Sequence, residues 1–306
     1  MACLLTGCHQ KSCCFEPCVE YAATERDLAQ LESPFSPLNA LEKGADWGRE
    51  LRMGQAFAKE MDLYRALTCF KRAHLLIPRE NSTRILQIDF SVFMCYYVAG
   101  KWQEAVEWFE KSTLVAVTPA FPAYGSLLIM LQDAYQMDRR EEKAEHYLRL
   151  LNEGSEEAAR DLELSHLLRE GCAESAQCLA LREKPLCEVS QTLEAFFKCK
   201  KSVRTAQWLN ALLPGAGYSY VGLHRTALTS FALNSLFIAA AYRFFERGDV
   251  AAGIFTSSLE FGWYFGGING AGLAAKEYNE ALYSRMMRPV MLKQRLFPIL
   301  MVEFGF

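Results

Sequence analysis

The spacing of apolar and polar residues changes along the chain. Residues 25–201 are rich in Glu, Lys and Arg, and Ala and aromatic residues recur among them at helical spacing. That period is typical of amphipathic α-helices. Residues 205–275 contain very few charges. The pattern predicts an all-α protein with a water-exposed helical part followed by an apolar helical part.

The clearest feature of the amphipathic part is internal repetition. Small residues, phenylalanines and a proline stand at regular spacing in its first copy: Gly54, Phe57, Ala66, Phe70, Ala73 and Pro78. The small residues allow two antiparallel helices to approach closely, and the phenylalanines fill the space between hairpins. The proline ends the second helix, because it cannot continue the hydrogen-bond ladder.

The spacing around Ala66 occurs twice more along the chain. One copy is centred on Ala105 and another on Ala144, so both steps between central alanines are 39 residues. Each copy has a tyrosine nine residues before the alanine and an apolar residue four after it: Tyr96, Phe109, Tyr135 and Leu148. The equal steps favour true repetition over a generic helical bundle.

This pattern resembles the tetratricopeptide repeat, a helix-turn-helix unit of about 34 residues. The copy over residues 47–80 fits almost throughout, whereas Phe93 stands where the family prefers a small residue, so the second helix pair is expected to be splayed. The resemblance implies a solenoid over residues 47–184, with its last helices as a cap. It also implies a concave groove, lined by the first helix of each pair, that binds peptides or partner proteins.

The apolar part predicts a membrane domain over residues 202–285. Residues 226–242 carry no charge, and a second apolar stretch at residues 250–275 is broken only by Glu260. A helix that crosses a bilayer needs about 20 apolar residues, and the first stretch reaches this length with Phe244 and Phe245. The prediction is a transmembrane helical hairpin, and the alternative is a pair of buried helices in a soluble domain.

Five residues in these stretches are candidates for helix packing. Gly262, Gly266 and Gly270 fall at four-residue intervals on one helix face, which permits close helix contact in membranes. Asn234 and Glu260 lie thirteen residues on either side of the expected turn, so a hairpin places them at similar depth. We expect Asn234 to donate a hydrogen bond to Glu260 as a polar clasp. A proton or ligand site at Glu260 is the alternative.

The glycine- and tyrosine-containing stretch at residues 212–225 resembles the opening of TM2-type bacterial membrane hairpins. The resemblance covers about residues 208–275, and Glu260 matches the acidic residue in the second helix of those hairpins. The Gly-rich exit at residues 266–272 departs from the family. The resemblance implies a hairpin topology and says little about mechanism.

The N-terminal residues 1–40 are rich in cysteine and are expected to be a leash. Leu-Thr-Gly-Cys at residues 5–8 resembles the bacterial lipobox, which makes Cys8 the lipidation candidate. The residues before it are too few for a signal peptide, so a truncated signal and a chance match both fit. His9 and the nearby cysteines are metal-ligand types, but the chain has no Cys-x-x-Cys pair and no metal is expected.

The C-terminal tail, residues 286–306, is basic and then apolar. Its last apolar side chains alternate with other residues: Leu300, Val302, Phe304 and Phe306. The alternation predicts a short β-strand or an interfacial segment.

Composition narrows the function further. The net charge is −3 and no extended basic stripe is present, which argues against nucleic acid as a partner. The chain also lacks Gly-x-Ser-x-Gly, His-Glu-x-x-His and phosphate-loop motifs, so neither an enzyme active site nor a cofactor is expected.

These observations predict a non-enzymatic adaptor of the bacterial cell envelope. The repeats bind other proteins, and the hairpin contacts membrane lipids and is a candidate surface for homo-oligomers. The alternative is an oligomeric transporter or channel component that uses Glu260. Basic residues outside both ends of the hairpin favour cytoplasmic repeats, whereas a lipidated Cys8 favours the opposite side, so inner and outer membranes both fit.

Overall fold

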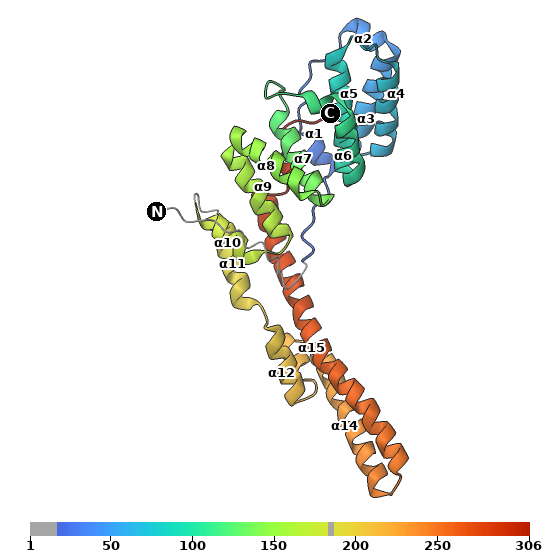
Figure 1. The fold of residues 1–306 in the computed structure, drawn as a ribbon, viewed down its shortest axis with the longest axis vertical. Helices are drawn as coiled ribbons and strands as arrows, with labels where there is room; N and C mark the ends of the chain where they lie inside the picture. The colour runs from blue at the N-terminus through green and yellow to red at the C-terminus, as the bar shows by residue number, and fades with distance from the viewer. Residues whose placement is uncertain (1–16, 183–186) are drawn as a thin grey trace. The chain divides into compact units, whose positions relative to one another are not determined.

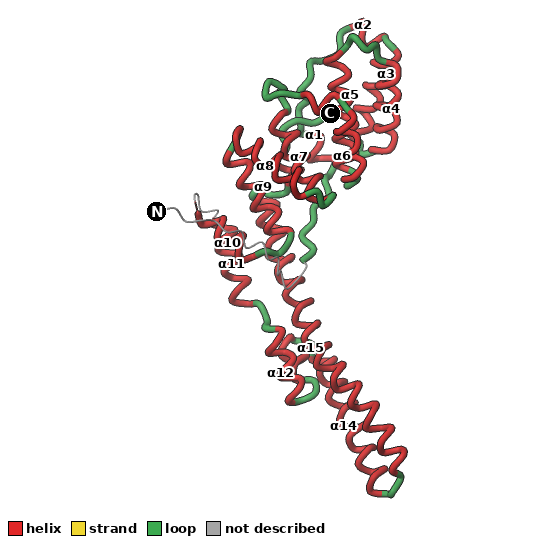
Figure 2. Tube along the Cα trace, viewed as in Figure 1, coloured by secondary structure: helices red, strands yellow, loops and turns green. Residues whose placement is uncertain are grey.

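The computed structural model describes residues 17–182 and 187–306. Within these ranges the protein is all-helical, as the sequence predicts, and no β-strand is formed (Figures 1 and 2). The chain divides into two compact units. One contains Glu20–His166 and Met291–Phe306 and is called the repeat unit here, and the other contains Leu167–Val290 and is called the hairpin unit.

Three helical hairpins form most of the repeat unit. They are α3 (Asp46–Lys59) with α4 (Leu63–Leu76), α5 (Ser82–Val98) with α6 (Trp102–Lys111), and α7 (Tyr124–Met137) with α8 (Glu141–Gly154). The helices of each pair contact one another. Each hairpin holds one of the predicted central alanines, and all three alanines are buried.

The turns inside the three hairpins share one backbone geometry. Met61, Gly100 and Arg139 have positive φ values of 60°, 68° and 60°, and they are 39 residues apart, like the central alanines. A residue in this left-handed conformation commonly ends a helix, because it lets the following amide bond back to the last turn. The repetition predicted from side chains is therefore also present in the backbone.

The hairpins pack through the small residues that the sequence singled out. A Cβ atom at Gly54 would lie 2.6 Å from the ring of Phe70, so only glycine allows α3 to pack this closely on α4. In the second hairpin Phe93 is buried and contacts the ring of Phe109, with centroids 6.2 Å apart. That large side chain occupies the position where a small residue was expected.

The residues before the repeats are folded against them. Of the expected leash, residues 20–40 belong to the repeat unit and contain α1 (Glu25–Ala29), while α2 (Ala40–Gly44) follows directly. Leu28 and Leu38 are buried. The leash prediction is therefore wrong for this part of the chain, because its apolar side chains contribute to the core.

The C-terminal tail also belongs to the repeat unit. It forms the short helix α16 (Pro298–Met301) and then an extended segment, in which Phe304 makes an isolated parallel bridge with Glu32. One bridge does not make a strand, so the tail differs from the predicted β-strand. Its apolar side chains are buried by packing against helices instead of pairing in a sheet.

The hairpin unit contains six further helices in the described part of the chain. They are α10 (Ala173–Arg182), α11 (Cys187–Cys199), α12 (Val203–Leu212), α13 (Ala216–Val221), α14 (His224–Glu246) and α15 (Val250–Lys293). Helix α9 (Glu156–Arg169) precedes them and crosses the boundary between the units. The expected capping region thus contains α9 and α10, but α10 clusters with the hairpin unit.

Helices α14 and α15 form the predicted antiparallel pair, which turns at Gly248 with φ +81° (Figure 1). Helix α15 is 44 residues long and continues through the Gly-rich stretch 266–272 and past residue 275. Glycine alone does not end a helix when its missing side chain lets other elements pack against it.

Candidate protein-binding groove and membrane hairpin

The hairpin α14–α15 exposes large apolar side chains. Leu228, Leu236 and Ile238 on α14 and Phe255 and Phe261 on α15 are 56–69% exposed. Among the described residues, α14 is the one helix that is long and apolar enough to cross a membrane. Exposed apolar surface on this scale is unfavourable in water and is typical of a membrane or protein contact.

The interior of the same hairpin is polar. Ser230 and Asn234 on α14 and Thr256 on α15 are at most 9% exposed. The hydroxyl of Thr256 donates to the carbonyl oxygen of Ala252 at 2.9 Å, which satisfies it within its own helix. Polar residues inside and apolar residues outside are the reverse of a water-soluble helix pair, and this order suits a hydrocarbon environment.

The predicted clasp between Asn234 and Glu260 is not formed. The Asn234 amide donates to the carbonyl oxygen of Ser230 at 2.6 Å, within α14. Among the described residues, Asn234 Oδ1 and both carboxylate oxygens of Glu260 have no hydrogen-bond partner.

The register of the hairpin explains this difference. Gly253 lies against Phe245 near the turn, and Gly267 lies against Ser230 farther from it. This pairing places Asn234 opposite residues 263–264, one helical turn beyond Glu260. Counting residues outward from the turn predicted the same depth for Asn234 and Glu260, but it missed this offset of one helical turn between α14 and α15.

The predicted glycine stripe is divided between two environments. A Cβ atom at Gly262 or Gly266 would meet nothing within 4 Å, so neither glycine packs against another described element. A Cβ atom at Gly270 would lie 2.3 Å from the hydroxyl oxygen of Tyr218 on α13. Only Gly270 therefore has the close-packing role that the sequence predicts within one chain.

Sequence analysis missed the glycines that hold α12 and α13 against α15. A Cβ atom at Gly217 would lie 2.2 Å from the carbonyl oxygen of Ala206 and 2.8 Å from the Cβ atom of Ala271. Ala206 and Ala271 are fully buried. The turn before α13 depends on Gly215, whose φ is +92°. The turn at Pro214 and Gly215 therefore folds the chain back so that α13 reaches α15.

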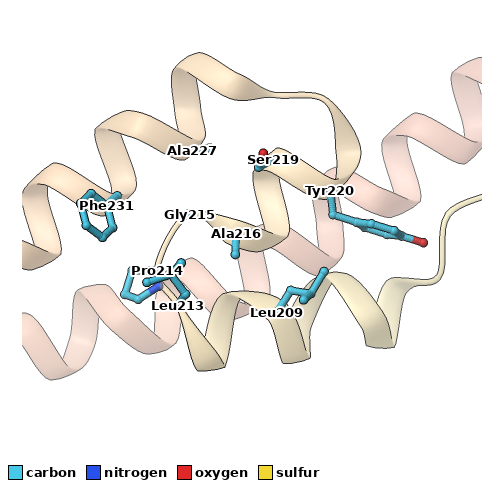
Figure 3. Close-up of a pocket in the computed structure, with 9 residues that line it drawn as sticks. All are labelled: Leu209, Leu213, Pro214, Gly215, Ala216, Ser219, Tyr220, Ala227 and Phe231. Atoms are coloured by element: carbon cyan, nitrogen blue, oxygen red, sulfur yellow. The ribbon is translucent and has the colours of Figure 1, made fainter.

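An apolar cavity of about 470 Å³ opens beside this turn (Figure 3). Side chains from α12, α13, α14 and the turn line it: Leu209, Leu213, Pro214, Gly215, Ala216, Ser219, Tyr220, Ala227 and Phe231. None of these side chains is charged at neutral pH. The cavity is chemically suited to hydrocarbon.

The face of the first helices that was expected to line an open groove is buried at three equivalent positions. Leu51, Phe90 and Ile129 occupy equivalent positions, 39 residues apart, on the first helices of the three hairpins. Their exposed fractions are 0%, 0% and 5%. Phe35 covers Phe90, with ring centroids 6.1 Å apart. No open groove is therefore present at these three positions.

The C-terminal tail packs against the repeat hairpins. The Glu303 amide donates to the hydroxyl oxygen of Ser126 at the start of α7, at 3.1 Å. The Phe306 ring stacks on Phe70, with ring centroids 6.0 Å apart. Both partners belong to the repeat hairpins, so the tail contacts the first hairpin and the third.

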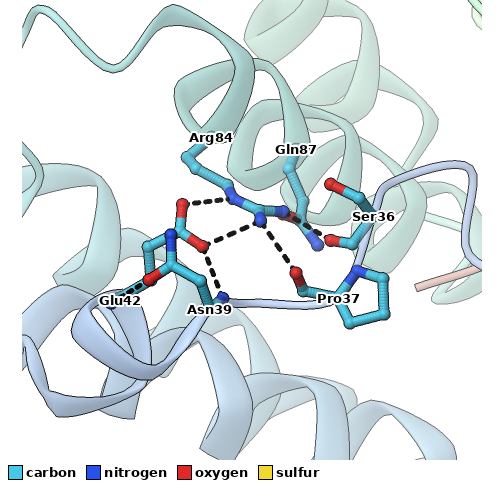
Figure 4. Close-up of polar contacts among 6 residues, drawn as sticks. All are labelled: Ser36, Pro37, Asn39, Glu42, Arg84 and Gln87. Carbon is cyan, nitrogen blue, oxygen red and sulfur yellow. Dashed lines mark hydrogen bonds and ion pairs between the residues drawn. The ribbon is translucent and has the colours of Figure 1, made fainter.

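A buried arginine fixes the N-terminal segment to α5 (Figure 4). The Arg84 guanidinium donates to both carboxylate oxygens of Glu42, at 2.9 and 3.0 Å, and to the carbonyl oxygens of Ser36 and Pro37, at 2.7 and 3.2 Å. These bonds from Arg84, and the Asn39 amide, lower the pKa of Glu42. The cluster satisfies its charges internally and is structural.

The buried carboxylate of Asp89 connects two hairpins. Asp89 on α5 accepts bonds from the amide and the hydroxyl of Thr113, at 2.9 and 2.7 Å. Its other oxygen lies 3.2 Å from Nε2 of His74 on α4. The hydrogen bond to Asp89 raises the pKa of His74 despite its partial burial. His74 is therefore the group whose charge links α4 to α5.

The remaining sequence candidates do not form a site in the part of the chain that is described. Cys8 lies outside the described residues, as do His9, Cys13 and Cys14. Within residues 17–182 and 187–306, no three His, Cys, Asp or Glu side chains are grouped to hold a metal ion. Phe57 and Tyr96 lie on the first helices of their hairpins and Leu148 lies on α8. Lys71 on α4 donates a hydrogen bond to the Tyr96 hydroxyl oxygen at 2.6 Å.

Comparison of the chain with protein-family models, curated proteins and solved structures gave no match. Over residues 17–182 and 187–306 the structure is all-helical, with one helix long and apolar enough to cross a membrane.

Proposed function

We propose that the protein is a non-enzymatic adaptor of the bacterial cell envelope. Its hairpin unit embeds in a membrane through α14 and α15, and its repeat unit, a solenoid of the tetratricopeptide type, binds other proteins. The observation that carries the proposal is the reversed polarity of the hairpin, in which Leu236 and Phe261 are exposed while Ser230 and Asn234 are buried.

The repeat unit supports the second half of the proposal. Three hairpins with turns 39 residues apart, at Met61, Gly100 and Arg139, form a regular stack of helix pairs. Stacks of this kind present extended surfaces to other polypeptides, and they contribute positioning rather than chemistry. Binding of a partner protein, and not of nucleic acid, suits the net charge of −3.

Membrane embedding is tested by fractionating cells that express the full-length chain. We expect the protein to stay in the membrane pellet at alkaline pH and to float with liposomes after reconstitution. A chain that purifies as a dissolved monomer without detergent contradicts the proposal. Protease protection in spheroplasts then determines on which side of the membrane the repeat unit lies, and mass spectrometry of the N-terminal peptide determines whether Cys8 is lipidated.

Partner binding is tested by crosslinking from the exposed surface of the repeat unit. Tyr64 and Leu75 lie on α4 and are more than four-fifths exposed, so a photoreactive residue at either position reaches a bound partner. We expect one defined protein to be captured from both positions. A photoreactive residue at buried Phe93 is the matched control, and equal capture from that position contradicts specific binding.

A second function is favoured by the unpartnered carboxylate of Glu260. An oligomer of hairpins, joined through the open face at Gly262 and Gly266, would place several such carboxylates around one path. A transporter or channel component of this kind requires ion or proton flux in reconstituted vesicles. Glu260→Gln should abolish that flux, whereas an adaptor with the same substitution keeps its membrane insertion and partner binding.

A further inference from the structure

We propose that the apolar cavity at the Pro214 turn binds one acyl chain of an anionic phospholipid, whose phosphate contacts the ammonium group of Lys201. The lipid fills the space between α12, α13 and α14 and is a ligand of the hairpin unit. This inference rests on the proposed membrane location of α14 and α15, and it names the membrane component that this unit recognises.

The cavity has the size and the lining of a site for hydrocarbon. Its volume of about 470 Å³ lies within the range of roughly 300–1,000 Å³ that is typical of small-molecule sites. Of the nine residues that line it, only Ser219 and Tyr220 have polar side chains, and both lie on α13. Walls of this composition offer water few hydrogen bonds, so an apolar occupant is favoured.

The cavity is continuous with the exposed apolar surface of the hairpin. Leu213 and Phe231 belong to its lining and are 52% and 47% exposed, so the wall of the cavity extends onto the surface. Leu228 precedes Phe231 by three residues on α14 and is 69% exposed. An acyl chain therefore enters from the bilayer without crossing a polar surface.

A lysine lies at the polar end of the cavity. Phe231 and Tyr220 lie at opposite ends of the lining, and the Tyr220 hydroxyl points away from the apolar end (Figure 3). The Lys201 ammonium lies over the Tyr220 ring, 4.8 Å from its centroid, and the Ser202 amide donates to the Tyr220 hydroxyl oxygen at 3.2 Å. A lipid whose chain lies along the cavity therefore has its headgroup beside a cation.

The backbone of Lys201 is fixed on α15. Its amide donates to the side-chain oxygen of Asn279 at 2.7 Å, and the Asn279 side-chain amide donates to the Lys201 carbonyl oxygen at 2.8 Å. Within residues 17–182 and 187–306, neither Lys201 nor the exposed Arg204 of α12 forms an ion pair with a carboxylate. Basic residues next to membrane-embedded helices attract anionic headgroups. Their charge favours an anionic lipid over a zwitterionic one.

The site is tested by native mass spectrometry of the full-length protein in detergent micelles that contain equal amounts of palmitoyl-oleoyl phosphatidylglycerol and phosphatidylcholine. We expect each chain to retain one phosphatidylglycerol molecule. Ala227→Phe and Ala216→Phe each fill the cavity and should abolish this retention. Ala232→Phe adds the same volume at an exposed position of α14 and is the matched control. Unchanged retention in a folded Ala227→Phe protein overturns the inference.

Lys201→Gln tests the contact with the headgroup. The substitution keeps the backbone bonds to Asn279 and should lower the ratio of retained phosphatidylglycerol to phosphatidylcholine about fivefold. Lys198→Gln removes the same charge from an exposed position of α11 and should leave the ratio unchanged. Equal retention of the two lipids by the wild-type protein overturns the inference. An equal fall in both lysine variants also overturns it, because that result indicates a general attraction to anionic surfaces.

A phosphatidylglycerol with a photoreactive group at the end of its palmitoyl chain tests the cavity in the wild-type protein, without any filled variant. We expect crosslinks within residues 209–231, and labelling spread evenly over α14 and α15 overturns the inference. Loss of the full-length protein from the membrane pellet at alkaline pH contradicts the proposed function instead. The lipid measurement stays readable in that case, because it is made in micelles and does not require insertion into a bilayer.

Discussion

The Phe306 ring stacks on the Phe70 ring with their planes inclined by 11° and their centroids 6.0 Å apart. The Phe70 ring also packs against Gly54 on the other helix of the first hairpin. The central aromatic residue of the first repeat therefore contacts both its own hairpin and the end of the tail. The packing of the first hairpin and the packing of the tail are linked through this one ring.

Gly54→Val tests the close contact in the first hairpin. The new side chain would overlap the Phe70 ring, which can move only by disturbing Phe306, so we expect a loss of about 1–3 kcal/mol in the free energy of unfolding. Gly125→Ala is the matched control, because a Cβ atom at Gly125 meets nothing within 4 Å. Urea unfolding followed by circular dichroism measures both variants. Equal stability of the two variants contradicts the packing described here.

The equivalent turn positions offer a test of the backbone repeat. Met61 and Arg139 adopt positive φ values that cost a non-glycine residue about 1 kcal/mol, whereas the same position in the second hairpin is already Gly100. Arg139→Gly and Met61→Gly should therefore stabilise the protein by up to that amount. Gly100→Ala should destabilise it by a similar amount. A shift of the melting temperature in the opposite direction for either glycine variant counts against the turn geometry.

Arg84→Met tests the cluster that holds the N-terminal segment. Removing the guanidinium leaves the Glu42 carboxylate and two carbonyl oxygens without their donor, and we expect a loss of about 3 kcal/mol. The lowered pKa of Glu42 means that the pair stabilises the fold above the ordinary value of 4.5. That contribution is lost as the pH falls through the lowered value.

The wild-type protein should accordingly lose more stability on acidification below pH 4.5 than Arg84→Met does. Arg49→Met is the control, because Arg49 is exposed and donates to the Gly44 carbonyl oxygen at the surface. Denaturant unfolding at pH 3 to 7 measures the free energy of unfolding of each protein and its dependence on pH. Parallel pH profiles for the wild type and Arg84→Met rule out the role assigned to this pair.

His74 should make stability depend on pH near neutrality. Its pKa is raised above the ordinary value of 6.5 by Asp89, so the ion pair is fully formed below that value and is lost as the pH rises through the raised pKa. His74→Gln should remove this part of the pH dependence between about pH 6 and 8. His146→Gln, on the surface of α8, should keep the wild-type profile. If the stability of the wild-type protein does not change over this pH range, the ion pair between His74 and Asp89 does not contribute to it.

Leu236→Asp tests the lipid-facing surface of α14. Leu236 is 64% exposed, and a carboxylate there costs little in water but about 2.5–3.5 kcal/mol inside a bilayer. Leu75→Asp, on the exposed face of α4, is the matched control, since Leu75 is 83% exposed in the repeat unit. We expect the membrane-resistant fraction to fall only for Leu236→Asp. Equal behaviour of the two variants indicates that α14 lies in water.

The sequence by itself determined the helices and their local pairing. Helical spacing and the positions of Ala66, Ala105 and Ala144 predicted three hairpins, and the uncharged run after Arg225 predicted α14. These features are local, because the period of apolar residues and the turn residues fix a helix and the face it buries. The same reasoning predicted Gly54 as a close-packing residue of the first hairpin. It placed Phe70 between hairpins, whereas the structure packs its ring against Gly54 within one hairpin.

Only the tertiary structure decided which distant segments meet. The periodicity of the repeats gave no sign that residues 20–40 and the tail pack against the hairpins. Many segments can bury an apolar surface, and long-range packing selects one of them. The polarity of Glu260 predicted a partner, but the offset between α14 and α15 left its oxygens unpaired. Likewise, identical glycines face open space at Gly262 and a helix at Gly217, since a missing side chain matters only where another backbone arrives.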